Sequence, residues 1–566
     1  VMEQLNTTFR TPLENLDSFN EGSLKVNLGT YLNNLSLGAT PRANSTVFIK
    51  YRIGGGKDTN LGVNVITSVD NVEFNVSGPL TNVNNQVVQS LRVTNVTPAV
   101  GGADQPTIEE IRNMVAFNFA AQERAVTLND YRILIKTMPA KYGAPLKFTY
   151  LPKISENINK AKGWFQNSME KHDYKGKYFY SYCTKSSHFK HVLNEALKND
   201  IHIETSSAFD IDIVNNLKKE GKIKDTTFVI CNGFKRDQYI KNIGELINSG
   251  HKNCIPIIDN YEELNLLMNE TDEKLNVGIR IASEEEPKFE FYTSRLGIGY
   301  KNIVSFYERE IADNEQVDLK MLHFFINTGI KDNAYYWNEL MKCLTVYINL
   351  KKVCPTLDSL NIGGGFPIKN SLAFEYDYQY MIDEIVTQIN ETCKDAGVDV
   401  PNIFTEFGSF TVGESGAAIY EVLYQKKQND RERWNIINSS FITTLPDSWA
   451  INKRFIMLPL NKWDKEYERV LLGGLTCDSD DYYNSEQHIN AIYLPIYEKD
   501  TPLYVGFFNT GAYQESIGGF GGLQHCLIPH PKHIIIDKNE KGQITTNIFK
   551  GQQKSEELLS ILGYEK

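Results

Sequence analysis

Short apolar runs alternate with amphipathic stretches through the middle of the chain. Between residues 141 and 415, strand-like runs such as FTYLP, FYSYCT, TFVICNG and MLHFFIN are separated by helical stretches such as SSHFKHVLNEALKN. This repeated strand–helix order, sustained over about 270 residues, predicts a (β/α)8 barrel and therefore an α/β fold. After residue 416 the helices become rare, and runs such as RFIMLPL and PLYVGFFN predict a β-rich C-terminal domain over 416–566.

The first 140 residues follow a different pattern. The first hundred residues hold fifteen Asn and only three Lys, and residues 46–98 are short β-branched runs broken by Gly, Asn and Pro. Such runs are typical of a small β-rich unit. The stretch TIEEIRNMVAFNFAAQERAV then changes to a helical period, with Thr107 and Glu110 spaced as a capping box. We therefore expect a small α+β appendage over 1–140.

Charge, hydropathy and cysteine content exclude several classes of protein. The net charge of −11 argues against non-specific nucleic-acid binding. No apolar run approaches the ~20 residues of a membrane span, and the first thirty residues lack the basic and apolar regions of a signal peptide. The eight cysteines form no C-x-x-C pair and no disulfide-framework spacing, so we expect reduced thiols in a cytoplasmic protein.

Candidate chemical groups stand at the ends of predicted barrel strands, where the active sites of such barrels lie. Lys185 follows FYSYC, and its amine could act as a nucleophile toward a carbonyl or simply reach solvent. Gly363, Gly364 and Gly365 follow SLNI and could either admit a phosphate to backbone N–H groups or form a tight turn. Glu406 ends NIFTE and could pair with a protonated ring nitrogen or cap a helix.

The predicted C-terminal domain adds further candidates. Cys477 precedes three acids in LTCDSDD, which suits either a proton donor beside a cation-binding carboxylate or a plain acidic loop. Tyr513 lies on a glycine-flanked turn in NTGAYQES and by itself predicts only a packed tyrosine. QHCLIPHPKHIII has a spacing unlike that of usual zinc sites, and its prolines stiffen it as a loop, so zinc is the less favoured interpretation. The residues concerned are His525, Cys526, His530 and His533.

Taken in this order, the motifs resemble those of the fold-type III pyridoxal-phosphate decarboxylases, which include the ornithine, diaminopimelate and biosynthetic arginine decarboxylases. The resemblance covers roughly residues 141–566 and rests on YGAPLKFTYLPKISENI, YCTKSSHF, LNIGGGFP, LPDSWAI, LTCDSDD and GAYQE. LPDSWAI followed by LPL and TCDSD is characteristic of the arginine decarboxylases in that group. The resemblance implies a barrel of the alanine-racemase type, the cofactor pyridoxal 5′-phosphate, and decarboxylation of L-arginine to agmatine and CO2 in polyamine biosynthesis.

The same resemblance implies roles for single residues. Lys185 would bind the cofactor covalently, Glu406 would keep its ring nitrogen protonated, and Cys477 would return a proton to the α-carbon of the substrate. The phosphate-binding positions are Gly363, Gly364, Gly365, Thr328 and Tyr513. Asp447 and Asp478 would hold the distal cationic group of the substrate. In the family, the residues that match Cys477 and Asp478 come from the partner subunit, which implies a homodimer with shared active sites. The resemblance also implies magnesium, but the sequence does not indicate which residues would bind it.

Two positions depart from the family pattern. The family's Glu-Pro-Gly-Arg run appears as Glu406-Phe407-Gly408-Ser409, so the arginine that anchors the phosphate is absent. The histidine that stacks on the pyridine ring is replaced by Phe325, which can stack but cannot share charge. We expect weaker cofactor binding, because a hydrogen bond to a charged group contributes roughly 1.5–3 kcal/mol.

The amino-terminal part resembles a different family. Over roughly residues 40–143, the order GGAD, IEEIR, QERAVTLNDY is similar to that of the contractile-tail phage baseplate wedge proteins of the baseplate-J type. Those proteins are structural, which implies baseplate proteins as partners of residues 1–140. KYGAP, at 141–145, fits the end of the one resemblance and the start of the other, with no flexible linker between them. We interpret the chain as a chimera of two coding sequences, joined by recombination or by faulty sequence assembly.

These observations leave two alternatives beside an arginine decarboxylase. The first is a decarboxylase of another basic amino acid, namely ornithine, lysine or diaminopimelate, because the sequence does not size a pocket bounded by Asp447 and Asp478. The second is a phage baseplate structural protein that carries an enzyme domain as a passenger. The intact set of Lys185, Glu406 and Cys477 is more than such a scaffold needs, which favours the enzyme.

Overall fold

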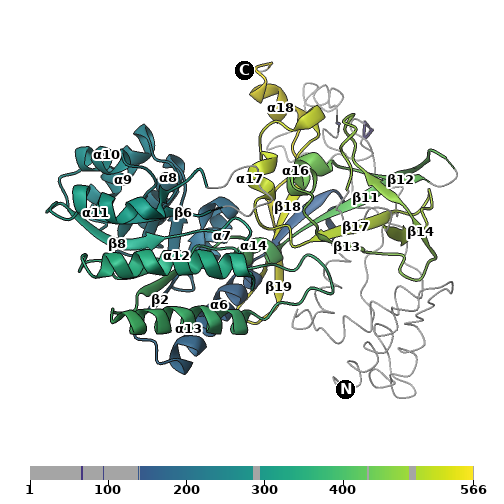
Figure 1. Ribbon diagram of the computed structural model, residues 1–566. Helices are drawn as coiled ribbons and strands as arrows, with labels where there is room; N and C mark the ends of the chain where they lie inside the picture. Colours follow the sequence, from purple (N-terminus) through teal and green to yellow (C-terminus); the bar gives the residue numbers. More distant parts are fainter. Residues whose placement is uncertain are drawn as a thin grey trace, which may run out of the picture.

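The computed structural model describes residues 65–67, 93–94, 138, 141–284, 294–429, 432–483 and 492–564 (Figure 1). The predicted appendage over 1–140, with its baseplate-like motifs, lies almost entirely outside the described residues and stays a prediction. Within the described part, no helix is both long and apolar enough to cross a membrane. The described chain forms a helix-covered barrel, at the left of Figure 1, and a second domain built mainly of strands, at the right.

Eight parallel strands close into a barrel, as the repeated strand–helix pattern predicts. In sheet order they are β2, β3, β4, β5, β6, β8, β9 and β10, and β10 pairs back to β2. Their bounds are Tyr178–Cys183 (β2), His202–Thr205 (β3), Val229–Cys231 (β4), Cys254–Ile258 (β5), Leu275–Ala282 (β6), Val317–His323 (β8), Ser359–Asn361 (β9) and Asn402–Phe407 (β10). A short strand, β7 (Ile298–Gly299), pairs with the end of β6. Parallel pairing brings the carboxyl ends of all eight barrel strands to one end of the barrel.

Helices connect the strands and cover the outside of the barrel. Their bounds are Leu151–Lys171 (α6), Lys190–Leu197 (α7), Ala208–Lys219 (α8), Asp237–Asn248 (α9), Glu263–Glu270 (α10), Ile303–Glu310 (α11), Ala334–Lys351 (α12) and Tyr378–Ala396 (α13), with single turns at Thr184–Ser186 (η3) and Tyr300–Asn302 (η4). Side chains of Ser207, Asn333 and Asp377 each accept a hydrogen bond from a first-turn N–H and so begin α8, α12 and α13. Gly397, in the left-handed conformation, ends α13.

The second domain is centred on an eight-stranded sheet, which confirms the predicted β-rich C-terminal domain. Its later strands are Gly416–Lys427 (β11), Arg433–Ile437 (β12), Ile456–Pro459 (β13), Leu471–Gly473 (β15), Leu503–Phe508 (β17), Lys532–Lys538 (β18) and Ile544–Lys550 (β19), with a separate pair Tyr467–Arg469 (β14) and Tyr493–Pro495 (β16). Its short helices are Phe441–Thr444 (α15), Pro446–Ala450 (α16), Gln514–Gly518 (α17), His525–Leu527 (η6) and Ser555–Ile561 (α18). Two further turns, Ser409–Val412 (α14) and Gly413–Ser415 (η5), connect β10 to β11, and α14 packs into the barrel core.

Strand β1 (Leu146–Tyr150) belongs to this second sheet although it precedes the whole barrel in the sequence. It pairs antiparallel with β11 and parallel with β18, and all five of its residues are buried. FTYLP has the apolar pattern of a barrel strand, but that pattern does not encode which sheet a buried strand joins. Met138 also packs here, in one apolar cluster with Leu146 and Ile534. The second domain is therefore built from both ends of the described chain.

Candidate active site

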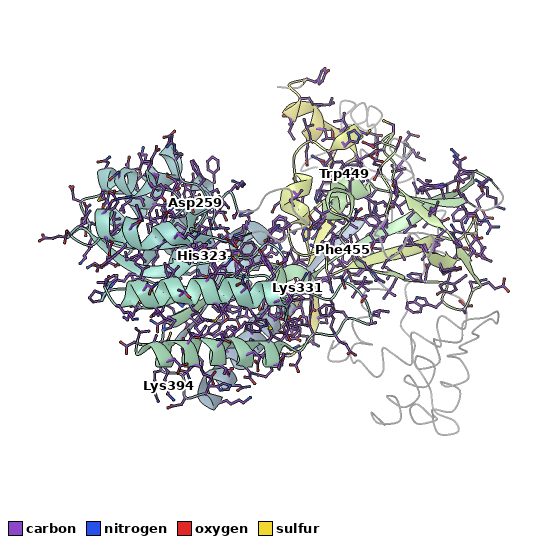
Figure 2. The ribbon with its side chains drawn as sticks, viewed as in Figure 1. Asp259, His323, Lys331, Lys394, Trp449 and Phe455 are labelled. Carbon is purple, nitrogen blue, oxygen red and sulfur yellow. The ribbon has the colours of Figure 1, made fainter. Side chains whose placement is uncertain are left out.

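Polar side chains gather inside the barrel where its strands end. Deeper in the barrel, Ile230, Ile257, Met321 and Phe404 form a buried apolar cluster, one residue from each of four strands. Because side chains alternate across a strand, the residues two positions later also face the interior. Those residues are Asn232, Asp259, His323 and Glu406. Figure 2 shows the chain running from His323 in the barrel toward Lys331 beside the second domain, so this polar end faces that domain.

Glu406 is the centre of a hydrogen-bond network at this polar end. Its carboxylate accepts hydrogen bonds from Asn361 Nδ2 at 2.6 Å and from Asn232 Nδ2 at 2.8 Å, and His323 Nε2 lies 3.2 Å from it. Burial alone would raise the pKa of Glu406, but His323, the charge of Lys185 and the hydrogen bond from Asn232 together outweigh burial and lower it to about 2. Glu406 is therefore anionic at neutral pH, which is the state that its predicted role requires.

Lys185 lies in η3, directly after β2, and its Nζ is 2.6 Å from Oε2 of the fully buried Glu204 at the end of β3. Burial alone would lower the pKa of Lys185, but the surrounding anionic groups, Glu204 and Glu406 among them, raise it. The amine is therefore protonated and held at the polar end by a carboxylate. The Lys185 side chain keeps 41% of its surface exposed, so a molecule that enters the barrel mouth can reach it.

Two loops at the same end have the close backbone approach that a phosphate site needs. Gly363 and Gly365 have φ angles of +68° and +105°, in the left-handed region that favours glycine. A Cβ at Gly364 would lie 2.2 Å from the carbonyl oxygen of Glu406, so this position also requires glycine. In the loop after β8, Thr328 Oγ1 is buried and has no hydrogen-bond partner among the described residues. An entering phosphate oxygen would supply that partner.

Other buried polar atoms near the site also lack partners in the described part of the chain. They are Asn232 Oδ1, Asp259 Oδ1, Arg280 Nε and His323 Nδ1. Buried polar groups are normally hydrogen-bonded, so a cluster of unpartnered ones indicates the place of a polar ligand. Phe325 follows β8, and the guanidinium of Arg280 lies 5.9 Å from the centroid of its ring. An aromatic face, a lysine, a carboxylate and a phosphate loop together fit pyridoxal phosphate, except that Ser409 replaces the anchoring arginine.

The second domain brings Tyr513 to this site. Its backbone N–H donates to the carbonyl oxygen of Ser186 at 2.8 Å, one residue from the candidate lysine. Asp447 is buried nearby, where its carboxylate accepts hydrogen bonds from Lys453 Nζ at 2.8 Å and from Gln514 Nε2 at 2.7 Å. A substrate cation at Asp447 would therefore compete with Lys453, which the predicted role did not include.

Cys477 and Asp478 are not brought to the barrel site within one chain. Both follow β15 in the second domain, and Cys477 is exposed. Among the contacts of the described residues, the Cys477 thiol meets Cys526 and the Asp478 carboxylate meets His525, with no hydrogen bond or ion pair to the barrel. Within a single chain they therefore contribute nothing to the group around Lys185.

The zinc interpretation of the QHCLIPHPKH segment finds no support. His530 contacts Glu515 at 2.8 Å, whereas His533 contacts Thr149 at 2.9 Å, so the histidines have different partners. In the ranges that the structure describes, no group of three or more His, Cys, Asp or Glu could hold a metal ion.

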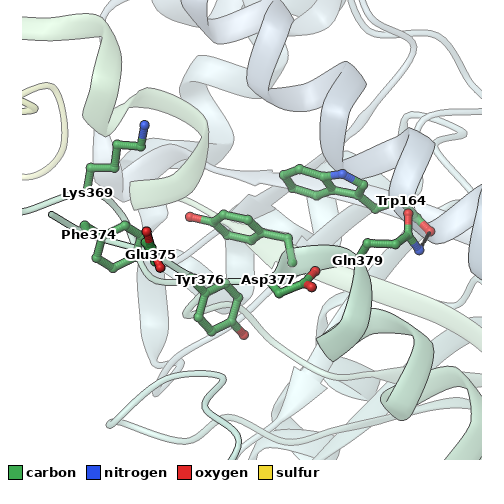
Figure 3. Close-up of a pocket in the computed structure, with 8 residues that line it drawn as sticks. Trp164, Lys369, Phe374, Glu375, Tyr376, Asp377 and Gln379 are labelled. Atoms are coloured by element: carbon green, nitrogen blue, oxygen red, sulfur yellow. Dashed lines mark hydrogen bonds between the residues drawn. The ribbon is translucent and has the colours of Figure 1, made fainter. Parts of the chain in front are cut away.

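A separate hollow of about 680 Å3 lies on the outside of the barrel, between α6 and the loop that leads into α13 (Figure 3). Trp164 stacks on Tyr378 there, with ring centroids 4.7 Å apart, and Lys369 and Glu375 stand at its edge. None of the predicted site residues lines this hollow. The polar end of the barrel therefore remains the candidate active site.

Comparison with known proteins identifies the family of the barrel domain. Residues 156–413 match the model of the pyridoxal binding domain of the pyridoxal-dependent decarboxylases. The barrel has the fold of these decarboxylases. The matched span runs from α6 to α14 and therefore contains Lys185, the glycine loop and Glu406. The fold is of the alanine-racemase type, as the sequence predicts.

Similar proteins cover about three quarters of the chain at low identity. The chain is 22% identical over 562 residues to a biosynthetic arginine decarboxylase of Prochlorococcus marinus, with 77% of this chain and 85% of that protein covered. The structure of the biosynthetic arginine decarboxylase of Campylobacter jejuni has a TM-score of 0.64 at 20% identity and covers 77% of this chain and 86% of its own. A diaminopimelate decarboxylase from M. jannaschii in complex with L-lysine has a TM-score of 0.62 at 17% identity, covering 75% and 93%.

Several residues of the decarboxylase site were not predicted from the sequence. Glu204, Asn232, Arg280 and Asn361 lie at the polar end of the barrel, and the first two of them bind each other at 3.0 Å. A simple signal could have identified two of them. In VICN and SLN, Asn232 directly follows and Asn361 ends an apolar strand, at the position that alternation turns inward. Glu204 and Arg280 lie inside β3 and β6 and carry no such signal.

Proposed function

We propose that the chain is a pyridoxal-phosphate-dependent decarboxylase that converts L-arginine to agmatine and CO2. The observation that carries the proposal is a reachable lysine and an anionic carboxylate, Lys185 and Glu406, at the polar end of a barrel that matches a pyridoxal binding domain. Arginine is supported by the LPDSWAI and TCDSD motifs and by relatives that are named biosynthetic arginine decarboxylases.

The positions of these residues support the roles that the resemblance implies. Bound here, pyridoxal phosphate would supply an acceptor for the electron pair that remains when the carboxyl group leaves as CO2. Lys185 would hold the cofactor through its amine, and the Glu406 carboxylate would keep the proton on its ring nitrogen. Phe325 would pack against the ring, while the Thr328 hydroxyl and the glycine loop would bind the phosphate. Glu204, 2.6 Å from Lys185 Nζ, accepts a proton when the amine has to be neutral.

We infer that the complete site needs a second copy of the chain. Cys477 and Asp478 would then complete the site of the partner, where the thiol returns a proton to the α-carbon and the carboxylate holds the guanidinium bidentately. Exposed apolar side chains beside them support a contact surface, because Leu475 is 43% exposed and Leu527 is 47% exposed. All eight cysteines are free thiols, which supports the cytoplasm as the compartment.

The test is a product assay on the full chain with pyridoxal phosphate, magnesium and an equal mixture of L-arginine, L-ornithine, L-lysine and diaminopimelate. We expect agmatine alone, no product from Lys185→Ala, and full activity from the control Lys190→Ala, whose side chain is exposed on α7. A different amine would overturn the substrate and keep the reaction. No product, together with no cofactor absorbance, would favour a structural protein with an inactive passenger domain.

A further inference from the structure

Two exposed cysteines meet on the surface of the second domain. The Sγ of Cys477, in the segment after β15, lies 3.5 Å from the Sγ of Cys526 in η6. Forty-nine residues separate them in the sequence, so their contact is made by the fold. The other six cysteines of the chain are all buried. In a single chain, a reagent in solution therefore reaches these two thiols before any other.

A second contact holds the same two segments together. His525 Nε2 lies 3.5 Å from Asp478 Oδ2, so consecutive residues of one segment face consecutive residues of the other. A disulfide has an S–S distance of about 2.05 Å, so the two sulfurs need to approach by only about 1.5 Å. Both cysteines are exposed, so their side chains have room to make that approach.

We propose that Cys477 and Cys526 form a thiol–disulfide site whose oxidant is a low-molecular-weight disulfide of the glutathione class. The thiolate of one cysteine attacks a sulfur of the oxidant, breaks its S–S bond and releases one thiol, leaving a mixed disulfide. The second cysteine, deprotonated to solvent, attacks the protein sulfur of that mixed disulfide and releases the second thiol. The cysteine pair loses two electrons and two protons, and the oxidant gains both to become two thiols.

The consequence for catalysis rests on the proposed function. In the reduced state, the hydrogen bond with Cys526 raises the pKa of the Cys477 thiol, so Cys477 keeps the proton that its predicted role delivers. The disulfide carries no proton and ties the sulfur to its own chain, so the partner's site loses its donor. Removing a general acid typically costs on the order of 10²-fold or more in rate. The pair would thus slow decarboxylation when the thiol pool is oxidised.

The experiment equilibrates the full-length chain with buffers of increasing ratio of oxidised to reduced glutathione, then traps free thiols with an alkylating reagent. We expect the protein to lose two hydrogen masses, with the peptide containing Cys477 joined to the peptide containing Cys526. Dithiothreitol should reverse the change. Mixed disulfides with glutathione as the only product, links between chains as the only product, or pairing of either cysteine with another one would overturn the proposal.

Cys526→Ser separates the disulfide from the loss of activity. This variant should form no internal disulfide, and its own activity should be the same before and after oxidation, whereas the wild-type chain should lose on the order of 10²-fold on oxidation and regain it with dithiothreitol. If the disulfide forms but the reduced chain makes no amine, the thiol site stands and the proposed function fails. If agmatine is produced but no disulfide forms at any glutathione ratio, the proposed function stands and the thiol site fails.

Discussion

Replacing Glu406 by glutamine should destabilise the cofactor-free chain in a pH-dependent way. The glutamine has almost the shape of the glutamate, but its NH2 group must face either the donor of Asn361 or the donors of Asn232 and His323. At least one N–H donor of the network then faces the NH2 group of the glutamine inside the protein, where a donor without an acceptor lowers the free energy of unfolding. The substitution also removes the negative charge for which the network is built.

The pKa of Glu406 gives the magnitude. It lies at about 2 in place of the ordinary 4.5, roughly 2.5 pH units lower, which corresponds to about 3 kcal/mol in favour of the ionised form. Because the folded-state pKa is lowered, this stabilisation is complete well above pH 4.5 and is lost as the pH falls toward 2. We expect Glu406→Gln to lose about 3 kcal/mol of unfolding free energy at pH 7, and about 1 kcal/mol less than that at pH 4.

Urea unfolding of the two proteins without cofactor, followed by circular dichroism at pH 7 and pH 4, measures these differences. Glu391→Gln, exposed on α13, serves as the control and should unfold like the wild type at both pH values. Equal stability of Glu406→Gln and wild type at pH 7 would refute the account of the network. The same deficit at both pH values would show that geometry, and not the charge, causes the loss.

Two further substitutions test the site and the second domain. Ser409→Arg should restore a charged partner for the phosphate and raise pyridoxal phosphate affinity roughly 10- to 150-fold, measured by absorbance titration, whereas the exposed Ser305→Arg on α11 should not. Lys147→Met should cost about 3–5 kcal/mol of unfolding free energy, because it leaves the Glu515 carboxylate, 2.8 Å away, without its buried cation. The more exposed Lys153→Met should cost about 1 kcal/mol or less in the same urea assay, and equal losses would argue against burial as the cause.

The barrel could be predicted from the sequence because its signal is local. Each strand is an apolar run followed by a helical period, and Lys185, Gly363 and Glu406 follow or end such runs, so their place at one end of the barrel is a consequence of parallel pairing. The role of Glu204 could not be found in this way, because a glutamate inside a four-residue strand also suits a strand that faces solvent. Its place beside Lys185 depends on the register of β2 and β3, in which Cys183 pairs with Glu204.

The remaining parts of the site could not be predicted because they depend on contacts between segments that are distant in the sequence. The histidines of QHCLIPHPKH are close in sequence, but β18 begins at Lys532 and turns His533 toward Thr149 in β1, while His530 meets Glu515 in α17. Sequence proximity therefore suggested a metal site where the fold builds two separate contacts. Conversely, the meeting of Cys477 and Cys526 leaves no trace in spacing, because it depends on the register of the whole second sheet.

The position of β1 in the middle of the second sheet has a consequence for synthesis. Leu146 leaves the ribosome long before its partners, because it pairs with Ile419 and with Lys532, which is 386 residues later. At roughly 5–20 residues per second, a strand whose five residues are all buried in the complete fold waits about 20–80 s for its last neighbour while the barrel between them is made. The second domain is thus the last part to close, and during that interval the nascent chain presents β1 to chaperones or to the same strand of another copy.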